Sequence, residues 1–240
     1  YKDTDLDPLI PGLKTGLPAS LAKDMNVSRI DSTTYRRGYL ALITMMDALV
    51  GRLVDHLDKS GIRKNTIVIF FADQGSMTGH HGLYSKKYFY KEVINSPLII
   101  SHPKHGRGKV ITRCVELLDL SKTMVTLYGC DSKDLAKTHG YDLMPLLKGG
   151  SFGRKFAHAE QHGVNMIQNE NFKLVSYEDG DILYDLKKDP DELTNVNSQH
   201  AEIAKMLREA RDHWQTHSGE VKPSLLKPET GGAKKRTGNR

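Results

Sequence analysis

One stretch decides the fold of this 240-residue chain: Thr66-Ile-Val-Ile-Phe-Phe-Ala-Asp73-Gln74-Gly75-Ser-Met-Thr-Gly-His80-His81-Gly82-Leu-Tyr-Ser-Lys86-Lys87. Residues 66–71 are β-branched or aromatic without polar alternation, which is typical of a strand covered on both faces in a parallel sheet flanked by helices. Ligand and catalytic groups in such sheets lie just beyond the carboxyl ends of the strands. Asp73 and Gln74 fall at that position, so the stretch predicts part of an active site.

The two residues after the strand carry oxygen atoms that suit a hard cation. Asp73 supplies a carboxylate oxygen and Gln74 an amide oxygen, which are the ligand types of Ca²⁺ and Mg²⁺. Calcium takes about 6 to 8 oxygen ligands, so other groups must complete such a site. The alternative is that Asp73-Gln74-Gly75 only ends the strand, since Asp and Gly are favoured in turns for backbone reasons.

The loop that follows holds one lysine and two histidines of interest. Lys86 lies thirteen residues after Asp73, and its ammonium group can neutralise an anionic group beside a metal, although a solvated lysine is the alternative. His81 can donate a hydrogen bond to a substrate, whereas we expect His80 at the surface. Neither histidine has a Cys partner at zinc spacing, which argues against a structural zinc site.

The order of these motifs resembles the second signature region of the sulfatases, in the alkaline phosphatase superfamily. The pattern extends upstream into a helical segment at 35–61 and downstream into segments at 116–120, 140–147 and 182–195, so it covers roughly residues 30–216. The residues that carry the resemblance in the signature region are Asp73-Gln74-Gly75, Gly79-His80-His81-Gly82-Leu83, Lys86, Tyr90-Lys91-Glu92 and Ser96-Pro97-Leu98-Ile99-Ile100.

The resemblance implies roles for four of these residues. Asp73 and Gln74 would be two ligands of a divalent cation, Ca²⁺ or else Mg²⁺. Lys86 would be catalytic and would contact the sulfate or the leaving-group oxygen, and His81 would be a further substrate contact. The substrate would be a sulfated small molecule or glycan, and the location periplasmic or secreted.

The family's nucleophile is a Cys or Ser in the pattern Cys/Ser-x-Pro-x-Arg, which is converted to formylglycine. Cys114 is followed by Val-Glu-Leu and Cys130 by Asp-Ser-Lys, so neither cysteine fits that pattern. The acidic pair that supplies the family's other metal ligands has no counterpart either. We therefore expect a carboxyl-terminal fragment that lacks turnover by itself, with an amino-terminal half supplied by the full-length chain.

The fold class expected from this pattern is α/β. Residues 1–150 would form the later part of an alkaline-phosphatase-like sheet domain, with a helix from Asp31 or Ser32 to Gly61, strands at 66–72 and 97–101, and a helix at 119–127. Residues 151–218 would form a small antiparallel meander, with strands at 155–160, 164–168, 172–177 and 182–186, and a final helix at 199–215. Residues 219–240 would be a disordered basic tail.

The formal charge of +6 invites a nucleic-acid partner, but the tail from 219 to 240 alone holds six Lys/Arg against two Glu. No base-stacking aromatic residues interleave these charges, so we expect no nucleic-acid partner. No apolar run approaches the roughly 20 residues needed to span a bilayer. Two alternatives stay open: a phosphate or phosphonate ester hydrolase of the same superfamily, and a non-catalytic glycan-binding pseudoenzyme.

Overall fold

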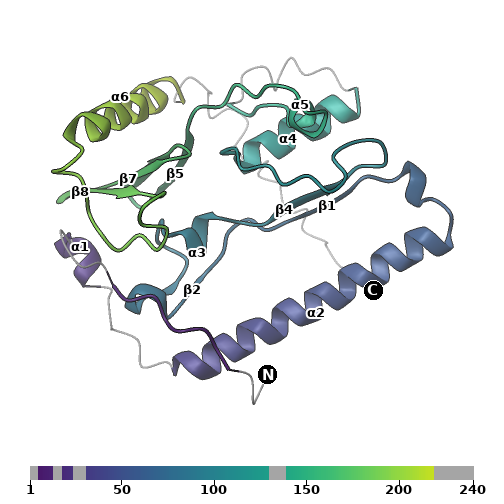
Figure 1. The fold of residues 1–240 in the computed structure, drawn as a ribbon, viewed down its shortest axis with the longest axis horizontal. Coiled ribbons are helices and arrows are strands. Elements are labelled where there is room, and N and C mark those ends of the chain that lie inside the picture. The colour runs from purple at the N-terminus through teal and green to yellow at the C-terminus, as the bar shows by residue number, and fades with distance from the viewer. Residues whose placement is uncertain (1–4, 13–17, 24–30, 130–138, 219–240) are drawn as a thin grey trace, which may run out of the picture.

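A computed structural model describes residues 5–12, 18–23, 31–129 and 139–218 (Figure 1). The tail predicted at 219–240 and the residue Cys130 lie outside the described residues. The first described helix is the short α1 (Ala19–Ala22), whose Leu21 is buried. No helix within the described ranges is long and apolar enough to cross a membrane.

The long helix predicted after Asp31 is confirmed as α2 (Ser32–Lys59). The Asp31 carboxylate caps it by accepting hydrogen bonds from the backbone N–H groups of Thr33 and Thr34. A hydrogen bond from the Thr34 hydroxyl, together with these two, lowers the pKa of Asp31. The helix ends before Gly61, whose φ of 73° is in the left-handed region that favours glycine.

The apolar residues of α2 recur three and four positions apart, which predicts a stripe that packs in the core, but this prediction is wrong for the described residues. Only Leu57 of the helix is buried. Contacts reach α2 mainly from β2 (Met77–Thr78) and the 3-10 helix η1 (Arg63–Asn65), and most of its residues are exposed. The apolar side chains that this leaves exposed are Leu42, Ile43, Met45, Met46, Leu49 and Leu53.

The strand that opened the sequence analysis is β1 (Val68–Phe71), and it pairs with β4 (Leu98–Ser101). The pairing is antiparallel, so the expectation of a parallel neighbour is wrong within the described residues. The reason is the connection: the chain returns through the turn of α3 (Lys91–Ile94) without the crossover helix that parallel strands need. Phe71 and Ile99 remain 49% and 61% exposed, so the described elements do not cover both faces.

The meander predicted in the carboxyl-terminal part is confirmed as one four-stranded antiparallel sheet in sequence order. Its two faces follow the alternation of side chains along each strand. Ile167, Leu174 and Leu183 face helix α6 (Ala201–Ser218). The strands are β5 (Ala157–Gln161), β6 (Val164–Gln168), β7 (Phe172–Tyr177) and β8 (Gly180–Asp185).

The opposite face of the sheet packs on the segment that follows β1. Met166, Val175 and Ile182 belong to the same core as Met77 and Leu83, the latter just before β3 (Tyr84–Ser85). The four-stranded sheet therefore lies between α6 and the candidate active-site segment, as Figure 1 shows. A domain boundary at residue 151 stays a prediction.

Two further helices lie above β4 in Figure 1: α4 (Leu117–Leu127), close to the predicted bounds, and the short α5 (Met144–Leu147). A buried ion cluster joins α4 to the start of β5. The Arg154 guanidinium contacts both carboxylate oxygens of Asp119 and lies 2.9 Å from the Glu116 carboxylate. Asp119 also accepts hydrogen bonds from the backbone N–H groups of Glu116 and Tyr141, each at 2.8 Å.

Asp119 is fully buried, and its removal would leave the Arg154 guanidinium without its main partner. We expect Asp119→Ala to lower the free energy of unfolding by about 3 kcal/mol or more, since it breaks a buried ion pair and leaves the N–H groups of Glu116 and Tyr141 without their acceptor. Denaturant unfolding measures this loss. Asp212→Ala removes a largely exposed carboxylate from a pair with Arg211 and serves as the control. Equal losses in the two variants would contradict a structural role for the buried pair.

Candidate active site

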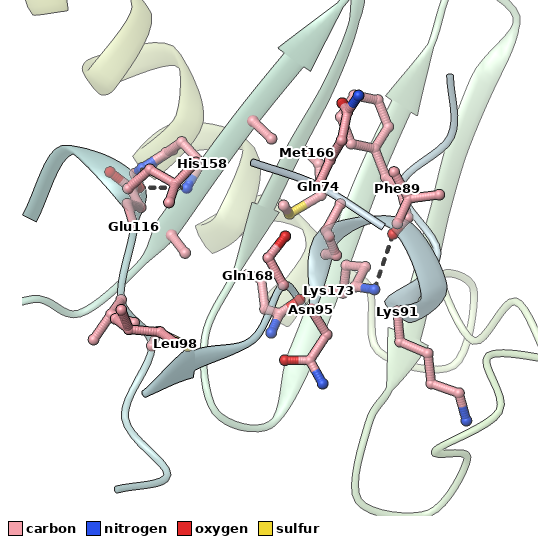
Figure 2. Close-up of a pocket in the computed structure, with 18 of the residues that line it drawn as sticks. Gln74, Phe89, Lys91, Asn95, Leu98, Glu116, His158, Met166, Gln168 and Lys173 are labelled. Atoms are coloured by element: carbon pink, nitrogen blue, oxygen red, sulfur yellow. Dashed lines mark hydrogen bonds and ion pairs between the residues drawn. The ribbon is translucent and has the colours of Figure 1, made fainter. Parts of the chain in front are cut away.

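A cavity of about 690 Å³ opens where β1 ends, and Asp73, Gln74 and Lys86 all line it. Figure 2 shows the cavity between the segment that carries Gln74 and Lys91 and the four-stranded sheet, which carries Gln168 and Lys173. The three residues singled out in the sequence therefore share one concave surface. This co-location was expected for residues at the end of one strand and in the following loop.

The Asp73-Gln74-Gly75 turn is fixed by its contact with α3. The Gly75 N–H donates to the Val93 carbonyl at 2.7 Å. A Cβ atom at Gly75 would lie 1.9 Å from the Glu92 carbonyl oxygen, so only glycine permits this approach. Asp73 is exposed, and one of its carboxylate oxygens accepts a hydrogen bond from the Gln74 N–H at 2.8 Å. The remaining acceptor capacity of both side chains is available to a cation.

Lys86 follows β3 and is exposed at the edge of the cavity. In the part of the chain that the structure describes, no carboxylate lies within ion-pair distance of its ammonium group. The residues after it, Tyr88 to Tyr90, are buried and anchor the segment in the core. The backbone beside Lys86 is thus held by the core, while its exposed ammonium group can reach an anion in the cavity.

His81 lies behind this surface and is fully buried. Its ring stacks on Tyr90 with centroids 3.8 Å apart, and its Nε2 atom is 3.9 Å from the Glu92 carboxylate. Burial lowers the pKa of His81 to about 4, so the imidazole is neutral near pH 7. His81 is not among the residues that line the cavity, and its contact with substrate stays a prediction. His80, which we expected at the surface, is half-buried and accepts a hydrogen bond from the Ile10 N–H at 3.0 Å.

The sequence analysis missed a buried ion pair that forms one wall of the cavity. Lys173 of β7 is 1% exposed, donates to the Phe89 carbonyl at 3.0 Å and pairs with Glu192. Glu192 also accepts the Lys91 N–H at 2.9 Å, and burial lowers the pKa of Lys173. The available signal was a lysine between apolar residues of a predicted strand, Phe172 and Leu174. The acidic stretch at 189–192 forms a capped turn, in which the Asp189 carboxylate accepts the Leu193 and Thr194 N–H groups.

The donor set suits a hard divalent cation in kind but is small. Asp73 and Gln74 provide one carboxylate and one amide oxygen, as Ca²⁺ and Mg²⁺ prefer. Within the described ranges, no group of three or more His, Cys, Asp or Glu side chains is arranged to hold a metal ion. These two residues therefore fit as a partial ligand set.

Comparison with protein families supports the motif reading. Residues 79–217, more than half of the chain, match the profile described as N-sulphoglucosamine sulphohydrolase, C-terminal, and residues 13–130 match the sulfatase profile. The chain belongs to the sulfatase family. The sulfatase profile covers the site segment up to β4 and α4, and the carboxyl-terminal profile covers the sheet and α6.

Characterised sulfatases match this chain over part of their length. An N-acetylglucosamine-6-O-sulfatase of Bacteroides thetaiotaomicron is 27% identical over 215 residues, which are 80% of this chain and 38% of that protein. Arylsulfatase K of Xenopus laevis is 32% identical over 201 residues, which are 74% of this chain and 37% of that protein. The sulfatase chain thus spans less than two fifths of the length of these relatives.

Solved structures show the same fold. A protein in complex with its substrate, D-glucosamine-2-N,6-O-disulfate, aligns with a TM-score of 0.67 and 28% identity, covering 80% of this chain and 42% of the other. A phosphonate monoester hydrolase of Agrobacterium radiobacter aligns with a TM-score of 0.61 and 26% identity, covering 75% and 40%. The expected α/β class, with a small antiparallel sheet and a carboxyl-terminal helix, is confirmed.

The buried imidazole of His81 makes stability depend on pH. The unfolded chain binds a proton near pH 6.5, whereas the folded protein resists it down to about pH 4. The stabilising contribution is complete above pH 6.5 and is lost as the pH falls through this window, by up to about 3 kcal/mol. We expect His81→Gln to flatten this part of the pH dependence, measured by denaturant unfolding at several pH values. His56→Gln, on the exposed surface of α2, should keep the wild-type slope, and an unchanged slope in His81→Gln would refute this account.

Proposed function

We propose that this chain is the cation-binding and lysine-bearing part of a sulfuric ester hydrolase that acts on a sulfated carbohydrate. One observation carries the proposal: Asp73, Gln74 and Lys86 line a single cavity in a chain of the sulfatase family. The names of its relatives support the substrate class, since one is an N-acetylglucosamine-6-O-sulfatase and another protein was solved with a glucosamine disulfate.

Each residue of the cavity has a chemical part in this proposal. Lys86 holds its ammonium group near the sulfate and stabilises negative charge that develops on the leaving oxygen. Asp73 and Gln74 hold a divalent cation, Ca²⁺ or Mg²⁺, through their carboxylate and amide oxygens. Such a cation, when bound, polarises the sulfate as a Lewis acid. His81 supports the loop from behind, and its neutral ring is a further candidate for a hydrogen bond to substrate.

We propose that the nucleophile, a formylglycine, and the remaining cation ligands come from an amino-terminal half outside this chain. The length of its relatives supports this proposal. The chain covers only 38% of the N-acetylglucosamine-6-O-sulfatase and 37% of arylsulfatase K. Exposed apolar side chains on α2, together with Phe71, offer a surface for that half to cover. A covalent mechanism needs its nucleophile, so the chain alone does not turn over. A periplasmic or secreted location stays a prediction.

Calcium titration of the dialysed chain tests the cation site. We expect weak binding, and we expect Asp73→Asn to weaken it at least about tenfold, because the site loses the one carboxylate that we assign to it from the described residues. Isothermal titration calorimetry gives the affinities. Asp55→Asn, an exposed carboxylate on α2, is the matched control and should bind like the wild type. Equal affinities in all three proteins would contradict cation binding at Asp73.

Turnover by the chain joined to its amino-terminal half tests the reaction. We expect Lys86→Ala to lower kcat/KM for a glucosamine sulfate by about 100-fold or more, as for the loss of a group that stabilises developing charge. Lys87→Ala changes the neighbouring charge and should have a small effect. Faster turnover of an aryl phosphonate than of the sulfate would favour the phosphonate hydrolase, to which the structural likeness also extends. No turnover of either ester would favour the non-catalytic alternative.

A further inference from the structure

A second cavity, of about 540 Å³, lies at the other end of the β1–β4 pair from Asp73. Asp73 follows the end of β1 that pairs with Leu98, whereas the second cavity is formed around Ser101 and η1. The paired residues at the two ends are three apart along the strand, which is about 10 Å. Among the described residues, the two cavities share no lining residue.

The lining of this cavity is strongly basic. Within the described residues it contains no Asp or Glu, and no carboxylate lies within ion-pair distance of its Arg and Lys side chains. Lys104 and Lys148 add positive charge beside it, since both act on the His102 ring. The basic residues that line it are Arg63, Lys64, His102, His105, Arg107 and Lys109.

Several contacts hold the basic groups in place. The Arg63 guanidinium donates to the Thr66 carbonyl at 3.1 Å and to the Ser101 hydroxyl. The His102 Nδ1 atom accepts the Lys104 N–H at 3.0 Å, and its ring lies 4.7 Å from that of His105. Burial and then the nearby cations lower the pKa of His102, which agrees with a positive local potential.

The backbone brings the two outer cations to the rim through glycines in the left-handed region. Gly106 and Gly108 have φ values of 77° and 65°, which allow the tight turn that places Arg107 and Lys109. Like charges gathered without carboxylates repel one another and destabilise the folded state. A bound polyanion would offset this repulsion.

The lining also discriminates among polyanions. It contains no Phe, Tyr or Trp in the described chain, so single-stranded nucleic acid would find no aromatic surface on which to stack. The cations come from two separate segments, η1 and residues 102–109, and are spread along the rim. A chain with several sulfate groups pairs with more of them than a single sulfate ion does.

We propose that this basic cavity is a second binding site for a sulfated oligosaccharide, separate from the cavity at Asp73, which holds the polymer while one sulfate occupies the active site. The class of ligand, a sulfated carbohydrate, rests on the proposed function. The residues assigned to bind it here are new. Arg107 and Lys109 are exposed at the rim and are the groups that contact the sulfates of the glycan.

The experiment measures equilibrium binding of a labelled heparin-derived oligosaccharide to the full chain at low ionic strength, by fluorescence anisotropy. We expect Arg107→Ala/Lys109→Ala to weaken binding about tenfold, as the loss of two charge pairs at an exposed site predicts. Added salt should weaken wild-type binding by screening. The matched control is Lys187→Ala/Lys205→Ala, which removes two exposed lysines elsewhere and should bind like the wild type.

Three further measurements test whether the sulfate groups and the basic cavity account for the binding. The desulfated oligosaccharide should not bind, and duplex DNA of equal charge should bind more weakly than the sulfated glycan. Lys234→Ala/Lys235→Ala, in the basic tail, should leave most of the affinity. Wild-type affinity in Arg107→Ala/Lys109→Ala, tighter binding of DNA, equal binding of the desulfated sugar, or loss of all binding with the tail variant would each overturn the proposal.

This measurement is independent of turnover. If the joined enzyme hydrolyses no sulfate but the oligosaccharide binds at Arg107 and Lys109, the proposed function fails and the second site stands. If it hydrolyses a monosaccharide sulfate while the Arg107→Ala/Lys109→Ala variant binds the oligosaccharide normally, the second site fails and the function stands.

Discussion

The buried ion pair between Lys173 and Glu192 is the constraint on which the candidate active site depends. Lys173 of β7 donates to the Phe89 carbonyl, and its partner Glu192 accepts the backbone N–H of Lys91. Burying a lysine costs several kcal/mol unless it is paired and hydrogen-bonded, and here both conditions hold. The pair therefore fixes the start of α3 on the sheet. Because Gly75 packs against α3, the ion pair also fixes the turn that carries Asp73 and Gln74.

The four-stranded sheet is the platform for this arrangement because both of its faces are apolar. Ile167, Leu174 and Leu183 pack on α6, and their neighbours along the strands pack on the site segment. The sheet thus supports a loop that has only one short strand pair of its own, β2 with β3. A cavity between the two layers follows from this geometry, with the ion pair in its wall and Lys86 at its edge.

In contrast to the four-stranded sheet, whose faces are covered, α2 and the β1–β4 pair leave large apolar side chains exposed. Isolated exposed residues of this kind are ordinary, but six along one helix form a surface that another protein element can cover. The catalytic interpretation requires a nucleophile and further cation ligands that this chain does not contain. We propose that the amino-terminal half that supplies them packs on this apolar surface. The basic cavity lies at the far end of the β1–β4 pair from Asp73, so the second site that we propose is separate from the candidate active site.

The sequence by itself determined the local structure and the residues of the turn after β1, which we propose to bind a cation. The cap at Asp31, the meander at 157–185 and the turn after Phe71 follow from side-chain periodicity and turn chemistry, which act over a few residues. Only the tertiary structure decided the pairing direction of β1, the burial of His81 and the partnership of Lys173 with Glu192. The strand pairing and the ion pair join residues that are 19 or more positions apart, and the burial of His81 depends on which segments pack over it. The periodicity of the sequence carries no information about long-range partners or about packing.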